Sequence, residues 1–163
     1  MQIKLLSPWL NHRARKPGTV IDTILLHATA GSTLSGAVET LKERELSYHY
    51  LIEKDGTVTK CVPYLSCAYH AGKSVGPQGS GVNEYSVGIS FVNMNDGKDP
   101  YTAEQTASAL ALIDTLKAIL PLRWLTTHYW VSPGRKNDPL KYPVSSLSDA
   151  CQLTLWKPRA TKT

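Results

Sequence analysis

One apolar, β-branched run, VIDTILLHAT at residues 20–29, constrains the fold of this chain more than any other segment. The run is closed by the breaker pair Gly31-Ser32, so it predicts a buried strand that ends at His27. A strand fixes the position of a residue at its end, and the loop that follows can open a site beside it. The sequence therefore places an imidazole where a buried sheet meets an accessible surface.

The next segments alternate between helix and strand patterns. Residues 33–45 carry apolar side chains at helical spacing and predict an amphipathic helix. Residues 47–64 form two alternating runs around Asp55-Gly56, which predicts an antiparallel hairpin. A glycine- and serine-rich loop over residues 72–81, long enough to be functional, precedes a short strand predicted at residues 86–93.

The clearest helix begins at Thr102, which has capping-box spacing to Gln105, and is expected to stop at Pro121. Its predicted apolar stripe consists of Ala109, Leu112, Ile113, Leu116 and Ile119. Residues 123–130 predict a strand that delivers His128, and a last helix is expected over residues 144–156. A basic tail at residues 157–163 is expected to fray. This order predicts the α/β class: a single domain with a mixed central β-sheet flanked by helices.

Composition limits the alternatives. The chain has 163 residues, 42% of them apolar, which is enough for one sizeable core. Its net charge of +5 favours polyanionic surroundings such as a bacterial wall or nucleic acid. No nucleic-acid-binding motif accompanies the charge. Three cysteines (Cys61, Cys67 and Cys151) do not predict a disulfide framework, and the N-terminal segment does not resemble a signal peptide. We therefore expect a product made in the cytoplasm.

A second imidazole lies far from the first, in the segment HYWVSPGRKNDP that begins at His128. The same segment supplies Lys136 and Asp138. Two imidazoles and a carboxylate form a ligand set that catalytic zinc accepts, with one position left for water, so the residues predict metal-assisted hydrolysis. Each residue alone has a plainer interpretation: His27 as a core or capping histidine, Asp138 as a turn starter, Lys136 as a solvated charge.

Five segments occur in the order and approximate spacing of a known family: LLHATAG, SYHYLIEKDGTV, AYHAG, NEYSVGIS and HYWVSPGRKNDP. With them the chain resembles the zinc-dependent N-acetylmuramoyl-L-alanine amidases of the amidase-2 type. That family includes phage endolysins, cytosolic amidases of muropeptide recycling and animal peptidoglycan recognition proteins. The resemblance runs from about Val20 to Pro139 and implies one catalytic domain over residues 1–163, with its core at about 20–143.

The resemblance implies roles for individual residues. His27, His128 and Asp138 match the ligands of a single zinc ion. Lys136 matches a lysine that stabilises the oxyanion, and Tyr48 matches a tyrosine that some phage members place beside the metal. The chain departs from other members at Ser90, where they carry a catalytic glutamate, and serine cannot replace that base.

Other polar residues carry weaker expectations. His70, in AYHAG, matches a histidine of the substrate groove, and Thr29 and Asn83 are candidates to orient loops or substrate. Tyr48 has the alternative of being only a half-buried strand aromatic. His49 is expected to be structural, because it points to the face opposite Tyr48, and His12 is expected to face solvent.

The resemblance implies hydrolysis of the amide between N-acetylmuramic acid and L-alanine by a phage or prophage endolysin acting on the cell wall. We expect a monomer whose partner is peptidoglycan, without nucleic acid or membrane insertion. A cytosolic amidase that recycles anhydro-muropeptides and a non-catalytic peptidoglycan-binding module are the alternatives. Activity on intact sacculi or on soluble fragments separates the endolysin from the recycling amidase. A metal assay separates both enzymes from the non-catalytic module.

Overall fold

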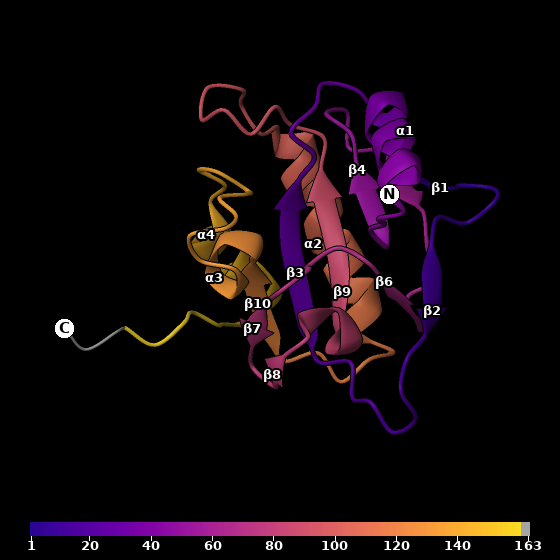
Figure 1. Cartoon of the computed structure of the whole chain (residues 1–163). Helices are drawn as coiled ribbons and strands as arrows, with labels where there is room; N and C mark the ends of the chain where they lie inside the picture. Colours follow the sequence, from indigo (N-terminus) through magenta and orange to yellow (C-terminus); the bar gives the residue numbers. More distant parts are fainter. Residues whose placement is uncertain (161–163) are drawn as a thin grey trace.

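The centre of the fold is a seven-stranded sheet with the order β1-β5-β4-β9-β3-β10-β11, in a computed structural model that describes residues 1–160 (Figure 1). The strands are β1 (Ile3–Leu5), β5 (Val58–Lys60), β4 (Tyr50–Ile52), β9 (Ser86–Phe91), β3 (Thr23–Ala28), β10 (Trp124–Thr127) and β11 (Thr154–Leu155). Within this sheet of the described residues, only β4 and β5 pair antiparallel, as the predicted hairpin requires; its other neighbouring strands are parallel.

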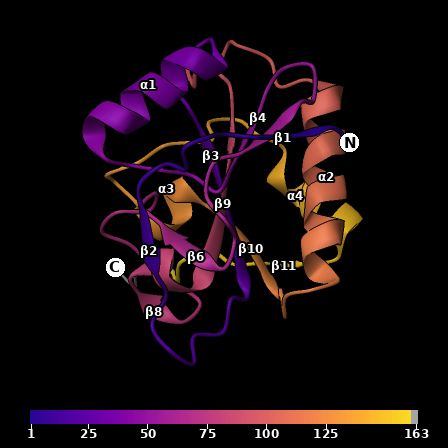
Figure 2. The ribbon, with the colours of Figure 1, turned by 90° about the vertical axis from the view of Figure 1, so that its right-hand side faces the viewer.

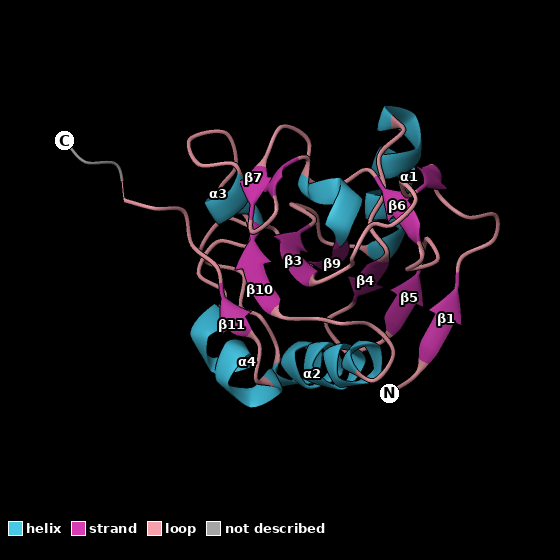
Figure 3. Ribbon diagram, turned by 90° about the horizontal axis from the view of Figure 1, so that it is seen from below, coloured by secondary structure: helices cyan, strands magenta, loops and turns pink. Residues whose placement is uncertain are grey.

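Helices cover both faces of this sheet. α2 (Ala103–Lys117) and α4 (Val144–Cys151) lie on one face, and α1 (Leu34–Arg44) and the short α3 (His128–Val131) lie on the other (Figures 2 and 3). The predicted fold class, a mixed central sheet flanked by helices, is confirmed.

The central strand β3 divides its side chains between the two faces. Ile24 and Leu26 are fully buried in the main core, which also contains Leu112 of α2. Leu25 belongs to a separate cluster on the opposite face. Because side chains alternate along a strand, His27 follows Leu25 and lies on the face away from α2. The core therefore holds one face of β3 and leaves the other face for a site.

A threonine caps the start of each of two predicted helices, and the sequence predicted the second of these caps. The side chain of Thr33 accepts a hydrogen bond from Gly36 N at the start of α1. The capping box between Thr102 and Gln105 is present in full at the start of α2. The end of α2 was predicted wrongly: it stops at Lys117, and Ile119 is 56% exposed. The chain tightens there, since both Ile119 and Leu120 donate their N–H groups to Leu116 O.

Two further boundaries differ from the prediction. β10 ends at Thr127, and its side chain accepts a hydrogen bond from Trp130 N, so His128 begins α3 and does not lie in a strand. The last helix ends at Cys151, not near Trp156, because Gln152 adopts a left-handed conformation with φ of 57°. The chain can then return as β11, which extends the sheet beside β10.

Smaller elements complete the chain. β2 (His12–Ala14) pairs with β6 (Ser66–Ala68), and β7 (Val75–Gly76) pairs with β8 (Gly79–Ser80) within the glycine-rich loop. A 3₁₀ turn, Val82–Tyr85, leads into β9. His12 is exposed as predicted, and the three cysteines are free and buried. Of the basic tail expected to fray, residues 161–163 lie outside the described part. No helix in residues 1–160 is long and apolar enough to cross a membrane.

Candidate metal centre

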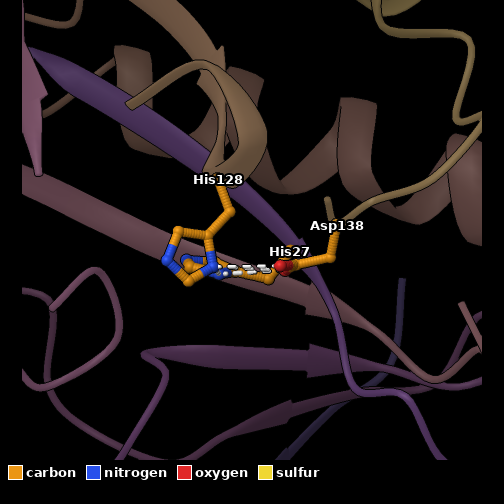
Figure 4. A group of neighbouring side chains, drawn as sticks. All are labelled: His27, His128 and Asp138. Atoms are coloured by element: carbon orange, nitrogen blue, oxygen red, sulfur yellow. Dashed lines mark hydrogen bonds and ion pairs between the residues drawn. The ribbon is translucent and has the colours of Figure 1, made fainter. Parts of the chain in front are cut away.

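Three side chains converge at the ends of two parallel strands (Figure 4). β3 and β10 pair in register, with Leu26 beside Thr127, so the residues that follow, His27 in β3 and His128 at the start of α3, lie close together. Their Nδ1 atoms are 3.0 Å apart. Asp138 arrives from the loop after α3, with Oδ1 3.1 Å from His128 Nδ1 and Oδ2 3.4 Å from His27 Nδ1. The three residues are buried, and their ligand atoms lie within 4.8 Å of one another.

Backbone groups hold the carboxylate in place. The N–H of Ala28, at the end of β3, donates to Asp138 Oδ2 at 3.2 Å. The carbonyl of Asp138 accepts a hydrogen bond from Tyr129 N at 3.1 Å. Asp138 is therefore tied both to the strand that carries His27 and to the helix that carries His128.

The hydrogen bonds of His128 assign its ring proton. Its Nε2 lies 3.0 Å from the carbonyl oxygen of Ala71. A carbonyl only accepts, so Nε2 carries the hydrogen and the neutral ring has its lone pair on Nδ1. That lone pair faces His27 and Asp138.

A longer chain of hydrogen bonds makes the same assignment for His27. Ser86 Oγ donates to Val82 O at 2.7 Å, so it is free to accept from His70 Nε2 at 3.3 Å. His70 Nδ1 is then an acceptor, and it lies 2.8 Å from His27 Nε2. His27 Nε2 therefore carries the hydrogen, and its Nδ1 lone pair points at the cluster.

Local electrostatics set the charges. Burial, and then the neighbouring His128, lower the pKa of His27 to about 4. Burial raises the pKa of Asp138, but the adjacent imidazoles of His128 and His27 outweigh burial and hold that pKa well below the ordinary value. At neutral pH the centre thus presents a neutral His27 imidazole and an ionised Asp138 carboxylate, the states that metal binding requires. Two nitrogen donors and one oxygen donor, all with free lone pairs, fit one zinc ion of the catalytic type.

A groove of about 1140 Å³ opens over this centre. Its lining includes Thr29, His70, His128, Lys136 and Asp138, together with the exposed side of α1. Asp138 is the sole carboxylate among the described residues that line it. The groove therefore brings the expected lysine and two expected substrate residues to the same opening.

Tyr48 also lines the groove, and its ring centroid is 4.8 Å from that of His27. Burial, and then the charge of Asp138, raise its pKa. The hydroxyl therefore stays protonated and can donate a hydrogen bond, but it cannot act as a base at neutral pH.

Asn83 does not line the groove. Its Oδ1 accepts hydrogen bonds from the N–H groups of His70 and Ala71, so it orients the loop that carries both residues. Of the two roles expected for Asn83, the structure shows the loop contact. His49 is buried, accepts from Gly88 N at 2.9 Å and is structural, as predicted.

Ser90 lies beside His27 in the register of β9 and β3, which places it on the site face. It is fully buried, and its Oγ has no hydrogen-bond partner among the described residues. Ser86, which ends the chain of hydrogen bonds from His27, was not predicted. No local pattern distinguishes it from any other strand serine, because its role depends on a histidine 16 residues away.

Known proteins resemble this chain in sequence and in fold. The family described as N-acetylmuramoyl-L-alanine amidase matches residues 17–141. The chain is 36% identical over 98 residues to the 1,6-anhydro-N-acetylmuramyl-L-alanine amidase AmpD of Enterobacter cloacae, a match covering 58% of this chain and 50% of the relative. The chain spans between 37% and 55% of the length of the curated relatives it matches.

Solved structures share the fold. The N-acetylmuramoyl-L-alanine amidase LysC from Clostridium intestinale superposes with a TM-score of 0.76 at 23% identity, covering 94% of this chain and 99% of that one. AmiD of E. coli, solved with an anhydro-muropeptide substrate, gives a TM-score of 0.75 at 22% identity and covers 87% and 62% of the two chains. Since the family match covers most of its length, this chain belongs to the amidase-2 family of N-acetylmuramoyl-L-alanine amidases.

Proposed function

We propose that the chain hydrolyses the amide between the lactyl group of N-acetylmuramic acid and L-alanine, with one zinc ion held by His27, His128 and Asp138. The observation that carries the proposal is the convergence of two assigned imidazole lone pairs and a carboxylate within 4.8 Å. A bound zinc ion supplies Lewis-acid activation of the amide carbonyl and of water. Water adds to the carbonyl carbon, the C–N bond breaks, and a lactyl carboxylate and the alanine amine are released.

Side chains of the groove stabilise the charge that develops on the carbonyl oxygen. Lys136 lines the groove two residues before Asp138 and offers a cation. Tyr48 stays protonated and offers a hydrogen bond. Donors of this kind contribute about 10²- to 10³-fold to the rate when they face the oxyanion. Thr29 and His70 lie where they can contact the substrate. With Ser90 at the place of the glutamate, a second carboxylate base is missing from the described groove residues.

We infer further that residues 1–163 act as one catalytic domain on the intact wall, as a phage or prophage endolysin does. The structural likeness to the endolysin amidase LysCS from Clostridium intestinale, which covers 94% of this chain and 97% of that one, supports this role. The absence of a second groove carboxylate in the described part supports the phage-type arrangement of Tyr48 and Lys136. The net charge of +5 favours association with an anionic wall.

A recycling amidase that cuts soluble anhydro-muropeptides is the second candidate. The observation that favours it is the 36% identity to AmpD of Enterobacter cloacae. The same centre serves both roles, so the substrate assay decides between them.

The test compares purified sacculi with a soluble anhydro-muropeptide, each with chelator, with restored zinc, and with the His128→Ala variant. His12→Ala is the matched control, because His12 is exposed and outside the groove. Zinc-dependent release of lactyl-amide products from sacculi supports the endolysin role, and activity on soluble fragments alone supports recycling. Tight binding of peptidoglycan, with neither hydrolysis nor bound zinc, would overturn both the endolysin role and the recycling role and would indicate a non-catalytic recognition module.

A further inference from the structure

A second cavity, of about 770 Å³, adjoins the groove on the other side of residues 133–135. Its walls come from β7, from α3 and from the segment 156–159 that follows β11. Gly134 and Arg135 line both cavities. The two spaces are therefore neighbours along one surface, separated only by the loop that leads from α3 to Asp138. The volume lies within the range of ligand pockets, about 300–1,000 Å³.

The walls of the second cavity are apolar and aromatic. Trp130 and Trp156 are half-buried, and Val75 is 56% exposed. The backbone of Trp156 is held in place, because its main-chain N–H donates to Leu125 O and its main-chain carbonyl accepts from Thr126 Oγ1. Rigid indole rings with an accessible surface offer apolar area at little entropic cost.

Cations surround these walls. Lys73, Arg135, Lys157 and Arg159 line the cavity, and none of its described lining residues is a carboxylate. Lys157 Nζ lies 5.2 Å from the centroid of the Trp130 ring. Arg135 is fixed by hydrogen bonds to the carbonyls of Ala71 and Lys73. The partition between the two cavities is therefore itself positively charged.

We propose that this cavity binds the glycan product of the reaction: an amino-sugar strand whose lactyl groups carry free carboxylates. The proposal rests on the proposed function. Indole rings match the apolar faces of pyranose rings, and the cations match the carboxylates. The short stem peptide also carries carboxylates but offers no extended ring face to two tryptophans. Charge complementarity and continuity with the groove thus favour the sugar strand.

A consequence follows for wall degradation. Each hydrolysis converts a neutral amide on the strand into a carboxylate, so the cut strand becomes a better ligand for the cavity than the uncut one. The enzyme then stays on a strand that it has begun to strip. Because the attraction is partly electrostatic, added salt weakens it.

The experiment measures binding of the full chain to denuded glycan strands, which have lost their peptides but keep the lactyl carboxylate. Neutral chitooligosaccharide and inorganic polyphosphate are the comparison ligands. The test variant combines Lys73→Gln with Lys157→Gln; both residues are exposed and lie outside the groove. Lys4→Gln with Lys98→Gln is the matched control, since both lysines are exposed and line neither cavity. Trp156→Leu tests the ring, with a thermal melt to check folding.

We expect denuded glycan to bind at least tenfold more tightly than chitooligosaccharide, and the test variant to lose most of that difference. Cleavage of a small soluble muropeptide should stay within twofold in both lysine variants. Equal binding of the two sugars, an unchanged test variant, or polyphosphate binding as tight as the glycan each overturns the proposal. If the chain binds denuded glycan through the lysines but cleaves nothing, the proposed function fails while the cavity assignment stands.

Discussion

His70 Nδ1 lies 2.8 Å from His27 Nε2, which makes His70 the direct support of a candidate metal ligand. The ring of His70 is held in turn by Ser86 on one side and rests on Gly88, where an added Cβ would lie 2.6 Å from His70 Nδ1. The sequence motif suggested only a substrate contact for His70. The geometry adds a positioning role for the same residue, and metal affinity can detect it.

Replacement of His70 by alanine should weaken zinc binding by about 10- to 100-fold, as loss of an outer hydrogen-bond partner does at other metal centres. The affinity is measured by competition with a chromophoric chelator. His12→Ala should leave it unchanged. Gly88→Ala should also weaken zinc binding, because the new methyl group displaces the His70 ring. If His70→Ala raised KM and left zinc affinity intact, only the substrate role would remain.

Lys136→Ala should lower kcat by about 10²- to 10³-fold with little change in zinc affinity, because Lys136 offers charge to the oxyanion and no lone pair to the metal. Steady-state hydrolysis of a soluble muropeptide, together with zinc content, checks both parts. Lys98→Ala is the control for removal of an exposed lysine. Loss of zinc from the Lys136 variant would instead assign this residue to the metal centre's structure.

Tyr48→Phe removes one hydroxyl and keeps the ring that packs against the cluster around Leu41 and Leu51. The rate should fall by about 10²-fold if that hydroxyl donates to the oxyanion. Folding should be unaffected, as judged by the thermal midpoint. A rate within twofold of the parent chain would show that Tyr48 is only a half-buried aromatic.

Arg15 anchors the N-terminal segment to the sheet through the backbone carbonyls of Tyr64, Asn83, Glu84 and Ser86. Arg15→Met should lower the free energy of unfolding by about 3 kcal/mol or more, since hydrogen bonds to a charged group contribute about 1.5–3 kcal/mol each. Chemical denaturation measures the change. Arg13→Met is the control: its side chain is 41% exposed, and its ion pair with Glu84 should contribute at most about 1 kcal/mol. Equal effects of both changes would contradict the anchor.

Glu84 gives a pH dependence to stability. Burial raises its pKa, but hydrogen bonds from the N–H of Lys16 and from Arg13 outweigh burial, so the net pKa lies below the ordinary value. A depressed carboxyl pKa adds stability above the unfolded pKa, and this stability is lost as the pH falls through the folded pKa. The Glu84→Gln variant should therefore melt below the parent chain at pH 7, and the difference should disappear in acid. A constant difference across that range would contradict the assignment.

The sequence by itself determined the features that depend on short stretches of chain. The apolar, β-branched run over residues 20–29 predicted the strand that ends near His27, the Asp55-Gly56 turn predicted the hairpin of β4 and β5, and the capping box located the start of α2. Motif order also identified His27, His128 and Asp138 as one group. The strand, the hairpin turn and the capping box each depend on residues close together in the sequence, and the motif order matches that of a known family. None of these features requires knowledge of a contact between distant segments.

Only the tertiary structure decided the rest. The hydrogen bonds that link His27 to His70 and His70 to Ser86 connect three segments of the polypeptide. Arg15 likewise donates hydrogen bonds to backbone carbonyls more than 45 residues away. The strand after the last helix exists because β11 pairs with β10, and the second cavity depended on bringing β7, α3 and the segment after β11 together. Hydrogen bonds and cavities between distant segments form when the core packs, and a one-dimensional pattern records neither their partners nor their distances.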